Sequence, residues 1–203
     1  MTYVAFEGGE GSGKSTQAKI LASRLDDAVV TREPGATSLG ARLRELLLTT
    51  ENMAIGARAE TLLMAADRAQ HVADVVRPAL ADGKVVISDR SVFSSLAYQG
   101  GGRELGIDEV RSINDWVLDG CWPDIVVLLD VDRETARARL HRSLDRLEQA
   151  SENFHLRVSD SFRQMAADDP QRWIVVPADQ PVDDVAVEVW AAISGRLGRS
   201  SGS

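Results

Sequence analysis

A glycine-rich segment near the start of the chain has the composition and spacing of a phosphate-binding loop. Gly8, Gly13, Lys14 and Ser15 fill the fixed positions of the G-x-x-x-x-G-K-[ST] pattern. Glycines carry no Cβ, so successive backbone N–H groups can turn toward phosphate oxygens. Lys14 can then reach the β- and γ-phosphates of a nucleotide, and Ser15 can place its hydroxyl on Mg²⁺. The predicted nucleotide-binding residues are Gly8, Gly9, Glu10, Gly11, Ser12, Gly13, Lys14, Ser15 and Thr16.

The segment Thr31-Arg32-Glu33-Pro34-Gly35 offers a second charged group after an apolar run. Pro34 and Gly35 predict a tight turn that holds Arg32 at the end of a strand, where it could make a two-pronged contact with a phosphate. Two other interpretations remain open at this point. Arg32 could be an ordinary surface arginine, or Glu33 could be its salt-bridge partner.

A third site is predicted where the apolar run 85–88 ends in Asp89 and Arg90. An aspartate there can hold Mg²⁺ or its waters or orient the attacking oxygen, and an arginine can clamp the acceptor phosphate. Asp130 competes for the metal role, because it also ends an apolar run. The next cation after Asp130 is Arg133, which fits the following helix better. We therefore expect Asp89 to be functional and Asp130 to be a helix-capping or strand-end residue.

Arginines elsewhere in the chain supply further candidates. Met64 and Arg68 are four residues apart on a predicted helix, so they share a face that could point into a cleft. Residues 133–157 hold six arginines, including Arg139, Arg142 and Arg146, in a stretch with weak apolar periodicity. This predicts a lid that closes over the transferred phosphoryl group. Alternatives remain open for both features. Arg68 could be a surface arginine of an amphipathic helix, and residues 133–157 could form a solvated helix with Arg–Glu pairs such as Arg146 with Glu148.

The elements that must position these groups alternate between strands and helices. Strands are predicted over 4–6, 28–31, 85–88, 125–129 and 173–176, and helices over about 15–25, 38–48, 58–81, 108–119, 133–141 and 183–197. Strands that are apolar throughout indicate a parallel sheet with both faces covered. In such sheets ligands bind at the carboxyl ends of the strands, and every candidate motif falls just after a strand or on the helix that follows, so the motifs can converge on one cleft.

Composition limits the class of protein. The chain has 203 residues with a net charge of −8, so a nucleic-acid polymer is not expected as its main partner. The lone Cys121 excludes an internal disulfide and is expected to be a packing residue. A strand follows the N-terminus at once, and no apolar run is long enough to span a membrane. These observations predict a cytoplasmic protein without a membrane partner.

With these residues in hand, the chain resembles the thymidylate kinase family over essentially its whole length. The segments that carry the resemblance are residues 6–16, 31–35, 66–68, 89–90, 94–100 and 145–148. The Asp-Arg pair followed by Ala-Tyr-Gln-Gly, with Thr-Arg-Glu-Pro-Gly upstream, is more specific than the phosphate loop alone. The resemblance implies transfer of the γ-phosphate of ATP to dTMP, giving dTDP for dTTP synthesis, with Mg²⁺. The metal ligands predicted from the residues themselves are Ser15 and Asp89.

The resemblance also implies the architecture. We expect an α/β fold of the P-loop NTPase type, with three layers, a five-stranded parallel sheet flanked by helices, and an arginine-rich lid. One domain is expected over residues 1–197, with the lid at about 141–155 and a disordered tail at 198–203. A homodimer is expected, packed through long helices. The apolar positions of helix 58–81 fit a dimer face or core burial equally well; they are Leu62, Ala65, Ala69, Val72 and Val76.

Individual roles follow from the same resemblance, residue by residue. Arg32, Arg68 and Arg90 would hold the acceptor phosphate, and Glu10 would face the 3′-hydroxyl of the sugar. Ser95 and Gln99 would bind the edge of the thymine ring, and Tyr98 would exclude a ribose. Arg139 would pack on adenine, whereas Arg142 and Arg146 would be lid donors. Gly11 replaces a loop arginine that some members have, which fits the bacterial subgroup with catalytic arginines in the lid.

Two positions depart from the family pattern. Met64 stands where a phenylalanine usually stacks on thymine, and this loses an aromatic interaction of about 0.5–1.5 kcal/mol. Ser91 stands where larger aromatic residues or histidine are common. A related kinase that acts on another nucleoside monophosphate or on a nucleoside is therefore the alternative. A nucleotide-dependent switch is a third hypothesis, but the Asn-Lys-x-Asp segment that reads guanine is absent from the sequence.

Overall fold

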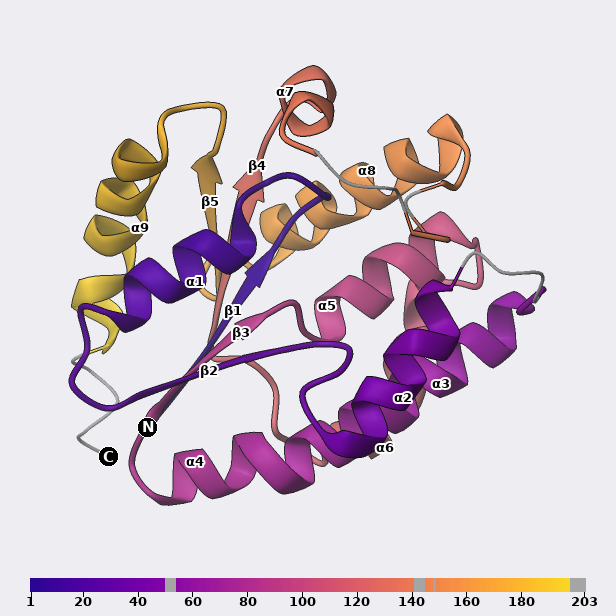
Figure 1. Cartoon of the computed structure of the whole chain (residues 1–203), viewed down its shortest axis with the longest axis horizontal. Helices are drawn as coiled ribbons and strands as arrows, with labels where there is room; N and C mark the ends of the chain where they lie inside the picture. Colours follow the sequence, from indigo (N-terminus) through magenta and orange to yellow (C-terminus); the bar gives the residue numbers. More distant parts are fainter. Residues whose placement is uncertain (50–53, 141–144, 148, 198–203) are drawn as a thin grey trace.

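A five-stranded parallel sheet forms the centre of the molecule (Figure 1). The computed structural model describes residues 1–49, 54–140, 145–147 and 149–197. The strands lie in the order β2-β3-β1-β4-β5, and all pairs are parallel. All five predicted strands are confirmed, with the bounds β1 Thr2–Glu7, β2 Ala28–Arg32, β3 Val85–Asp89, β4 Ile125–Asp130 and β5 Trp173–Pro177.

Helical segments cover both faces of this sheet, which gives the predicted three layers. In chain order the α-helices are α1 Lys14–Ala22, α2 Ser38–Leu48, α3 Ala57–His71, α4 Arg77–Ala81, α5 Val92–Ser95, α6 Ile107–Leu118, α7 Arg133–Ala138, α8 Glu152–Asp168 and α9 Val182–Leu197. Two π-helical segments continue α3 and α5; they are η1 Val72–Val76 and η2 Leu96–Gly102. The long helix predicted over 58–81 is thus α3, η1 and α4 in succession.

The alternation of side chains along each strand divides the core between the two faces. On β1, Val4 and Phe6 pack in a cluster with residues of α1 and α9, whereas Tyr3 packs with Val76 and Ala79 on the opposite face. This is the pattern expected of a strand that is buried on both sides. A further cluster joins α5, η2, α6 and α8 to β4 and β5. The packing fixes the strand ends and hence the edge of the sheet that carries the candidate groups.

Two helical regions were not predicted from the sequence. The segment 92–102 forms α5 and η2, although Gly100, Gly101 and Gly102 are poor helix formers. Helix α8 begins at Glu152, so residues 152–155 of the predicted lid are helical. The sequence did contain signals for α8, because the Ser151 side chain caps its first turn and Phe154, Val158 and Phe162 recur every fourth residue.

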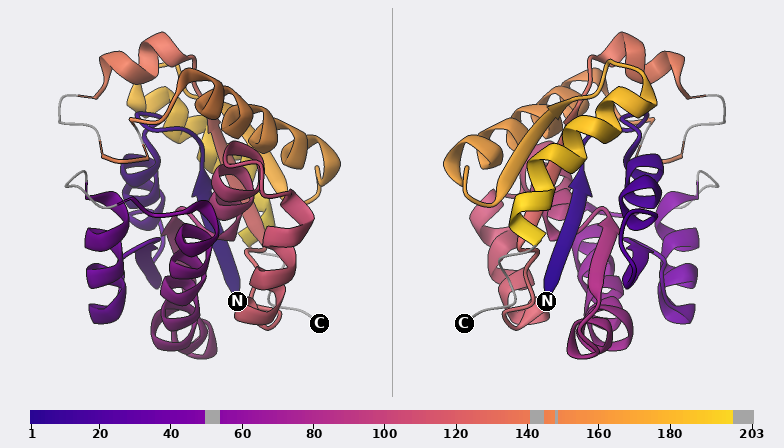
Figure 2. Two further views of the ribbon diagram at one scale, coloured as in Figure 1. Left: turned by 90° about the vertical axis from the view of Figure 1, so that its right-hand side faces the viewer. Right: turned by 90° about the vertical axis from the view of Figure 1, so that its left-hand side faces the viewer.

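The carboxyl ends of the strands meet at one edge of the sheet. Phe6 on β1 and Arg32 on β2 are both register partners of Asp89 on β3, so three predicted segments converge there. Helix α7 lies beyond this edge, and the N-terminus lies at the opposite end of the sheet (Figure 2). None of the described helices is long and apolar enough to cross a membrane.

Candidate active site

A cavity of about 840 Å³ opens at the carboxyl edge of the sheet. Its wall brings together the phosphate loop, the ends of β2 and β3, and residues of α2, α3, α5 and η2. The predicted site residues that line it are Glu10, Gly11, Gly13, Lys14, Ser15, Thr16, Arg32, Met64, Arg68, Asp89, Arg90, Ser95, Tyr98 and Gln99. The structure therefore places most of the predicted residues around one space, which is of the size that ligands occupy.

The phosphate loop wraps around the amino group of Lys14. Lys14 Nζ donates to Gly9 O at 2.6 Å, Gly8 O at 3.2 Å and Ser12 Oγ at 3.3 Å. Burial lowers the pKa of Lys14, and the nearby Arg90 lowers it further. Helix α1 starts at Lys14, so its N-terminal N–H groups face the cavity beside this cation.

Gly11 in this loop leaves no room for a side chain. Its φ is +73°, and a Cβ added there would lie 2.3 Å from the carbonyl oxygen of Ala136 in α7. Gly8, with φ of +135°, is equally constrained, because a Cβ would lie 2.6 Å from Leu129 O. The loop packs against α7 and β4 too closely for an arginine at position 11. Any catalytic arginine must come from elsewhere in the chain.

Ser15 and Asp89 form a hydrogen-bonded pair in the wall of the cavity. The Ser15 hydroxyl donates a hydrogen bond to Asp89 Oδ2. A hydroxyl and a carboxylate oxygen are ligands suited to Mg²⁺, which keeps several waters and takes its other ligands from phosphates. Among the residues the structure describes, no group of three or more His, Cys, Asp and Glu could hold a metal. The residues fit a magnesium site that phosphates complete.

Asp130, the competing aspartate, is engaged elsewhere. It ends β4, and both of its carboxylate oxygens accept hydrogen bonds from Arg163 on α8, one of them at 2.9 Å. The side chain that caps α7 belongs to Asp132, which accepts from Thr135 N at 2.8 Å. This agrees with the prediction that Asp130 is a strand-end residue.

Arg90 reaches across the cavity from an unusual backbone conformation. Its φ is +72°, in the left-handed region that few residues other than glycine adopt. The guanidinium forms an ion pair with Glu10 and donates to Ser94 Oγ at 3.0 Å and Tyr98 Oη at 3.1 Å. Burial alone would lower the pKa of Arg90, but the Glu10 carboxylate and other nearby acids raise it well above its ordinary value.

Glu7, which sequence reasoning missed, supports the loop that carries Arg90. Its buried carboxylate accepts hydrogen bonds from the backbone N–H and hydroxyl of Ser91, at 2.8 and 2.7 Å, and from the Ser94 hydroxyl at 2.6 Å. Ser94 Oγ in turn accepts from Arg90. Burial raises the pKa of Glu7. The signal in the sequence was an acid at the end of an apolar strand. Glu7 directly precedes the glycine pattern, and that pattern assigns no role to it.

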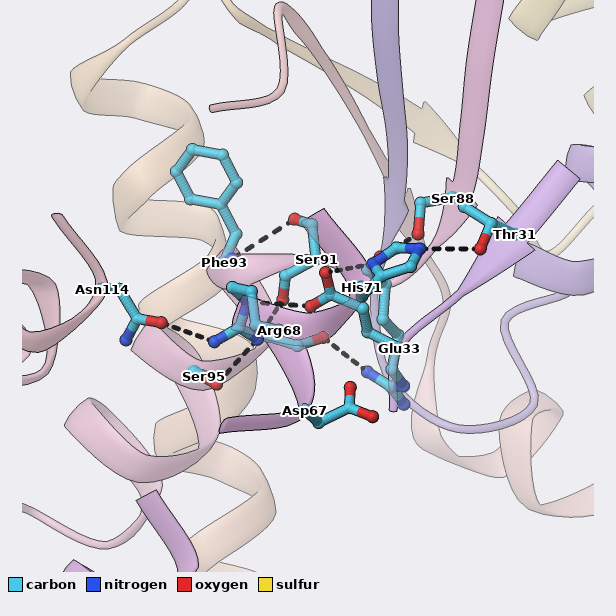
Figure 3. Close-up of polar contacts among 12 residues, drawn as sticks. Thr31, Glu33, Asp67, Arg68, His71, Ser88, Ser91, Phe93, Ser95 and Asn114 are labelled. Atoms are coloured by element: carbon cyan, nitrogen blue, oxygen red, sulfur yellow. Dashed lines mark hydrogen bonds and ion pairs between the residues drawn. The ribbon is translucent and has the colours of Figure 1, made fainter. Parts of the chain in front are cut away.

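Arg68 is buried in a polar network and does not lie on the surface (Figure 3). Its Nε donates to Glu33 Oε2 at 2.8 Å, and its Nη2 donates to Ser95 Oγ at 3.0 Å and to Ser91 O at 3.2 Å. Its Nη1 donates to Asn114 Oδ1, so four of the five N–H groups of the guanidinium are engaged. The surface alternative for Arg68 is wrong.

Glu33 is the partner of Arg68 and not of Arg32. It also accepts from His71 Nδ1 at 2.8 Å, and His71 Nε2 lies 2.7 Å from Thr31 Oγ1 (Figure 3). Burial would raise the pKa of Glu33, but Arg68 and His71 outweigh it and hold the pKa below its ordinary value. The suggested Arg32–Glu33 salt bridge is wrong. Arg32 is exposed at the cavity and has no ion pair within the described part of the chain.

Arg44, on α2, is a cavity residue that sequence reasoning also missed. It donates to Pro34 O at 2.8 Å, which ties α2 to the turn after β2. Burial lowers the pKa of Arg44, and Arg32 and Arg90 lower it further. The cavity therefore concentrates cations in an acidic protein. The sequence signal was weak, because an arginine on an amphipathic helix usually faces solvent.

Of the two arginines predicted as lid donors, Arg146 is among the described residues and Arg142 is not. Arg142 and Glu148, with their predicted roles, fall in the ranges that the structure does not describe, as does the predicted tail at 198–203. Arg146 donates to Glu60 Oε2 at 2.7 Å and to Leu47 O at 2.8 Å. Its ion-pair partner in the structure is thus Glu60 of α3, a fully buried carboxylate.

Arg139, predicted to pack on adenine, is not among the residues that line the main cavity. Its guanidinium donates to the carbonyl oxygens of Ala178 at 2.7 Å and Gln180 at 3.3 Å, in the loop after β5. Three loop residues, Gly8, Gly9 and Glu10, border a smaller adjoining cavity of about 240 Å³, which is also lined by residues of α7 and α8.

A phosphate loop beside a strand-end aspartate and a cluster of arginines defines the class of P-loop phosphotransferases. The thymidylate kinase family model matches residues 6–189 of this chain. The chain belongs to the thymidylate kinase family.

Individual relatives agree with this assignment. A thymidylate kinase of Halothermothrix orenii is 47% identical over 204 residues, covering 96% of this chain and 97% of the relative. A thymidylate kinase of Leifsonia xyli is 50% identical over 202 residues, covering 96% and 95%. The crystal structure of thymidylate kinase from Ehrlichia chaffeensis aligns with a TM-score of 0.79 at 32% identity, covering 95% of this chain and 98% of that chain. The predicted α/β fold and family are confirmed.

Proposed function

We propose that this protein transfers the γ-phosphate of ATP to dTMP and releases dTDP. The observation that carries the proposal is the single cavity in which Lys14, the Ser15–Asp89 pair and Arg90 converge. The membership of the thymidylate kinase family supports the donor and the acceptor. Phosphoryl transfer needs little covalent help, so the residues act by positioning the two phosphates and neutralising their charge.

The phosphate loop would bind the donor. Its N–H groups and the start of α1 would face the phosphates of ATP, and Lys14 would exchange its contacts with Gly8 O and Gly9 O for phosphate oxygens. Ser15 and Asp89 would hold Mg²⁺ between them, directly or through waters. When bound, this ion supplies charge neutralisation at the β- and γ-phosphates.

Arg90 and Arg32 would bind the acceptor phosphate. Arg32 is the register neighbour of Asp89, and the next residue after Asp89 is Arg90, so both arginines flank the metal site. Arg44 adds a third cation to this wall. A phosphate between such groups would be held opposite the donor for in-line attack.

The sugar and base would lie on the far side of Arg90. Glu10 and Tyr98 both contact the Arg90 guanidinium, which supports their predicted place beside the deoxyribose. Arg68 lies against Ser95, a residue predicted for the thymine edge. We therefore propose that Arg68 binds the base, whereas Arg32 and Arg90 bind the acceptor phosphate. The sequence had predicted that all three arginines bind the phosphate.

Arg146 and Arg142 would stabilise charge on the transferred group after the lid closes. Because Arg146 is bound to Glu60 in this structure, closure requires that this ion pair break or rearrange. Arg139, which follows α7 and donates to the loop after β5, would contact the adenine. These roles, and the division into one domain over 1–197 with a lid at about 141–155, stay predictions.

The acceptor is tested by an enzyme-coupled assay with Mg²⁺–ATP and a panel of dTMP, dUMP, dCMP, UMP and thymidine. We expect dTMP to give the highest kcat/KM. Met64 is the reason for testing related acceptors. Its thioether lines the base side of the cavity, where an aromatic ring would discriminate more strongly between bases. A clear preference for another acceptor would replace the proposed substrate.

We further propose a homodimer formed through α3 and α6. Of the five apolar positions considered on the long helix, Ala65, Val72 and Val76 are buried in the core, but Leu62 is 58% exposed. On α6, which packs beside α3, Trp116 is 84% exposed. Exposed large apolar side chains on neighbouring helices favour association. Sedimentation equilibrium of the wild type and of Trp116→Glu tests this, with a shift toward monomer expected in the variant.

A further inference from the structure

The base side of the cavity is built from two helical segments whose side chains meet in pairs. On α3, Glu60, Met64 and Arg68 follow at intervals of four residues and share one face. Ser95 and Gln99, on the facing segment, are also four residues apart. Arg68 Nη2 donates to Ser95 Oγ at 3.0 Å, and Gln99 Nε2 donates to Glu60 Oε1 at 2.9 Å. Met64 lies one turn of α3 from each pair.

The carboxylate of Glu60 decides which way the Gln99 amide faces. Glu60 is 0% exposed, and it also accepts from Arg103 Nε at 3.2 Å, Arg103 Nη2 at 3.1 Å and Arg146 Nη2 at 2.7 Å. Burial would raise the pKa of Glu60, but these donors outweigh it and hold the pKa below its ordinary value. An ionised carboxylate can only accept, so the NH₂ end of Gln99 must point at it.

We propose that Glu60 is a positioning residue that presents the Gln99 carbonyl oxygen to the acceptor base and so selects a keto pyrimidine. The proposal rests on the proposed function, because it needs a pyrimidine nucleotide in this cavity. Arg68 offers only donors, and the fixed Gln99 offers an acceptor. Thymine presents the complement, a carbonyl oxygen at C4 and an N–H at N3. Cytosine presents the reverse order, an amino group at C4 and a bare N3.

Selection of this kind depends on the orientation being fixed. A free glutamine could rotate its amide and offer its NH₂ group to cytosine N3. The Glu60 carboxylate forbids this rotation, because a carbonyl oxygen turned toward it would lose the hydrogen bond and face a negative charge. A mismatched base would then leave a cavity group unpaired, which is the situation in which polar sites discriminate most strongly.

The test compares Glu60→Gln with a matched control, Glu104→Gln. Glu104 is an exposed acid that pairs with Arg157, and its change removes the same charge without contacting Gln99. Values of kcat/KM are measured for dTMP and dCMP with Mg²⁺–ATP. In Glu60→Gln the ratio of dTMP to dCMP is expected to fall about tenfold, mainly through a higher KM for dTMP. The control is expected to keep the wild-type ratio.

A second pair of variants separates this role from a purely structural one. Glu60→Asp keeps the charge for Arg103 and Arg146 but withdraws the carboxylate from Gln99, so it should show the same loss even if Glu60→Gln does not fold. In a Gln99→Ala background, Glu60→Gln should lower the ratio no further.

Two results would overturn the role of Glu60. The first is an unchanged ratio in Glu60→Asp with only kcat or thermal stability lowered, since Glu60 would then serve the lid or the fold alone. The second is an additional loss of selectivity from Glu60→Gln in the Gln99→Ala background. A wild-type chain that preferred dCMP would instead overturn the proposed function, before any variant is examined.

Discussion

The cavity has two halves whose side chains are positioned in different ways. The phosphate half is the loop around Lys14, and the acceptor half contains Arg68, Arg90 and Gln99. In the phosphate loop, Lys14 is positioned by Gly8 O, Gly9 O and Ser12 Oγ, all within six residues of it in the sequence. On the acceptor side, Arg68, Gln99 and Ser94 are each held by a buried glutamate far away in the chain. The separations are 35 residues for Arg68 and Glu33, 39 for Gln99 and Glu60, and 87 for Ser94 and Glu7.

This difference determines whether a change in a ligand-binding residue also changes the stability of the fold. A loop that positions a side chain through its own backbone can lose that side chain at little cost to the fold. A buried glutamate without its cation leaves an uncompensated charge inside the protein, at a cost of about 3–5 kcal/mol. We therefore expect the phosphate half to separate activity from stability, whereas the acceptor half couples them.

The largest effect is expected from Lys14→Ala, which removes the cation of the phosphate half. We predict that kcat falls roughly 10³-fold while the melting temperature changes little. The reason is that the hydrogen bonds of Lys14 to other described residues all stay within its own loop, and burial already lowers the pKa of Lys14. Steady-state kinetics and thermal unfolding measure the two effects. Lys84→Ala, at a lysine paired with Asp82, is the control and should leave both unchanged.

Arg146→Ala tests whether the lid residue belongs to chemistry or to the acceptor framework. A catalytic donor predicts a fall in kcat of about 10²-fold with KM for dTMP nearly unchanged. If Arg146 only clamps Glu60, kcat stays at the wild-type value and stability alone falls. Arg163→Ala is the matched control, because that arginine pairs with Asp130 in an exposed ion pair.

Glu33→Gln should show the coupling on the acceptor side. At neutral pH we predict a loss of about 3 kcal/mol in the free energy of unfolding, because Arg68 keeps its charge in a buried site. Weaker dTMP binding should accompany it, since Arg68 loses its orienting partner. Urea unfolding and titration with dTMP measure these changes, and Glu45→Gln on the exposed face of α2 is the control.

The same variant carries a pH signature. The pKa of Glu33 is lower in the folded chain than in the unfolded one, so its stabilisation is complete above the unfolded pKa of about 4.3. It is lost as the pH falls through the folded pKa. The stability gap between wild type and Glu33→Gln should thus be constant from pH 7 to about pH 5.5 and narrow below about pH 4.5. A gap that widens with acid would contradict the buried ion pair.

The smallest effect is expected from Met64→Phe. A ring at this position can stack on the base, so KM for dTMP should fall about threefold to tenfold with kcat unchanged. Met64→Leu is the control, because it replaces the thioether with an apolar group that cannot stack. An unchanged KM in Met64→Phe would show that the base does not lie over α3.

What the sequence could predict follows the same division. The strands, the phosphate loop and the Asp89–Arg90 pair depend on neighbours in the chain, so local patterns were enough to place them at one edge of the sheet. Helix α8 was missed because its first residues fell within the lid predicted over about 141–155, although apolar residues recur along one face of the helix.

The supporting glutamates could not be found in this way. Glu60 lies in the first turn of α3, where an acid is expected on helix-dipole grounds alone. Nothing in its surroundings indicates a partner 39 residues away. The same limit explains why Glu33 was considered as a partner of its neighbour Arg32, when the fold brings Arg68 to it. Long-range pairs become visible only once the helices are packed.

The left-handed backbone of Arg90 has a consequence for engineering. Glycine would adopt a φ of +72° without strain, so Arg90→Gly would relieve a local backbone cost of about 1–3 kcal/mol. That substitution would also delete the guanidinium that joins Glu10, Ser94 and Tyr98. The protein accepts a locally unfavourable backbone conformation where its ligand contacts meet, so relieving the strain at this position would remove the contacts that the strain makes possible.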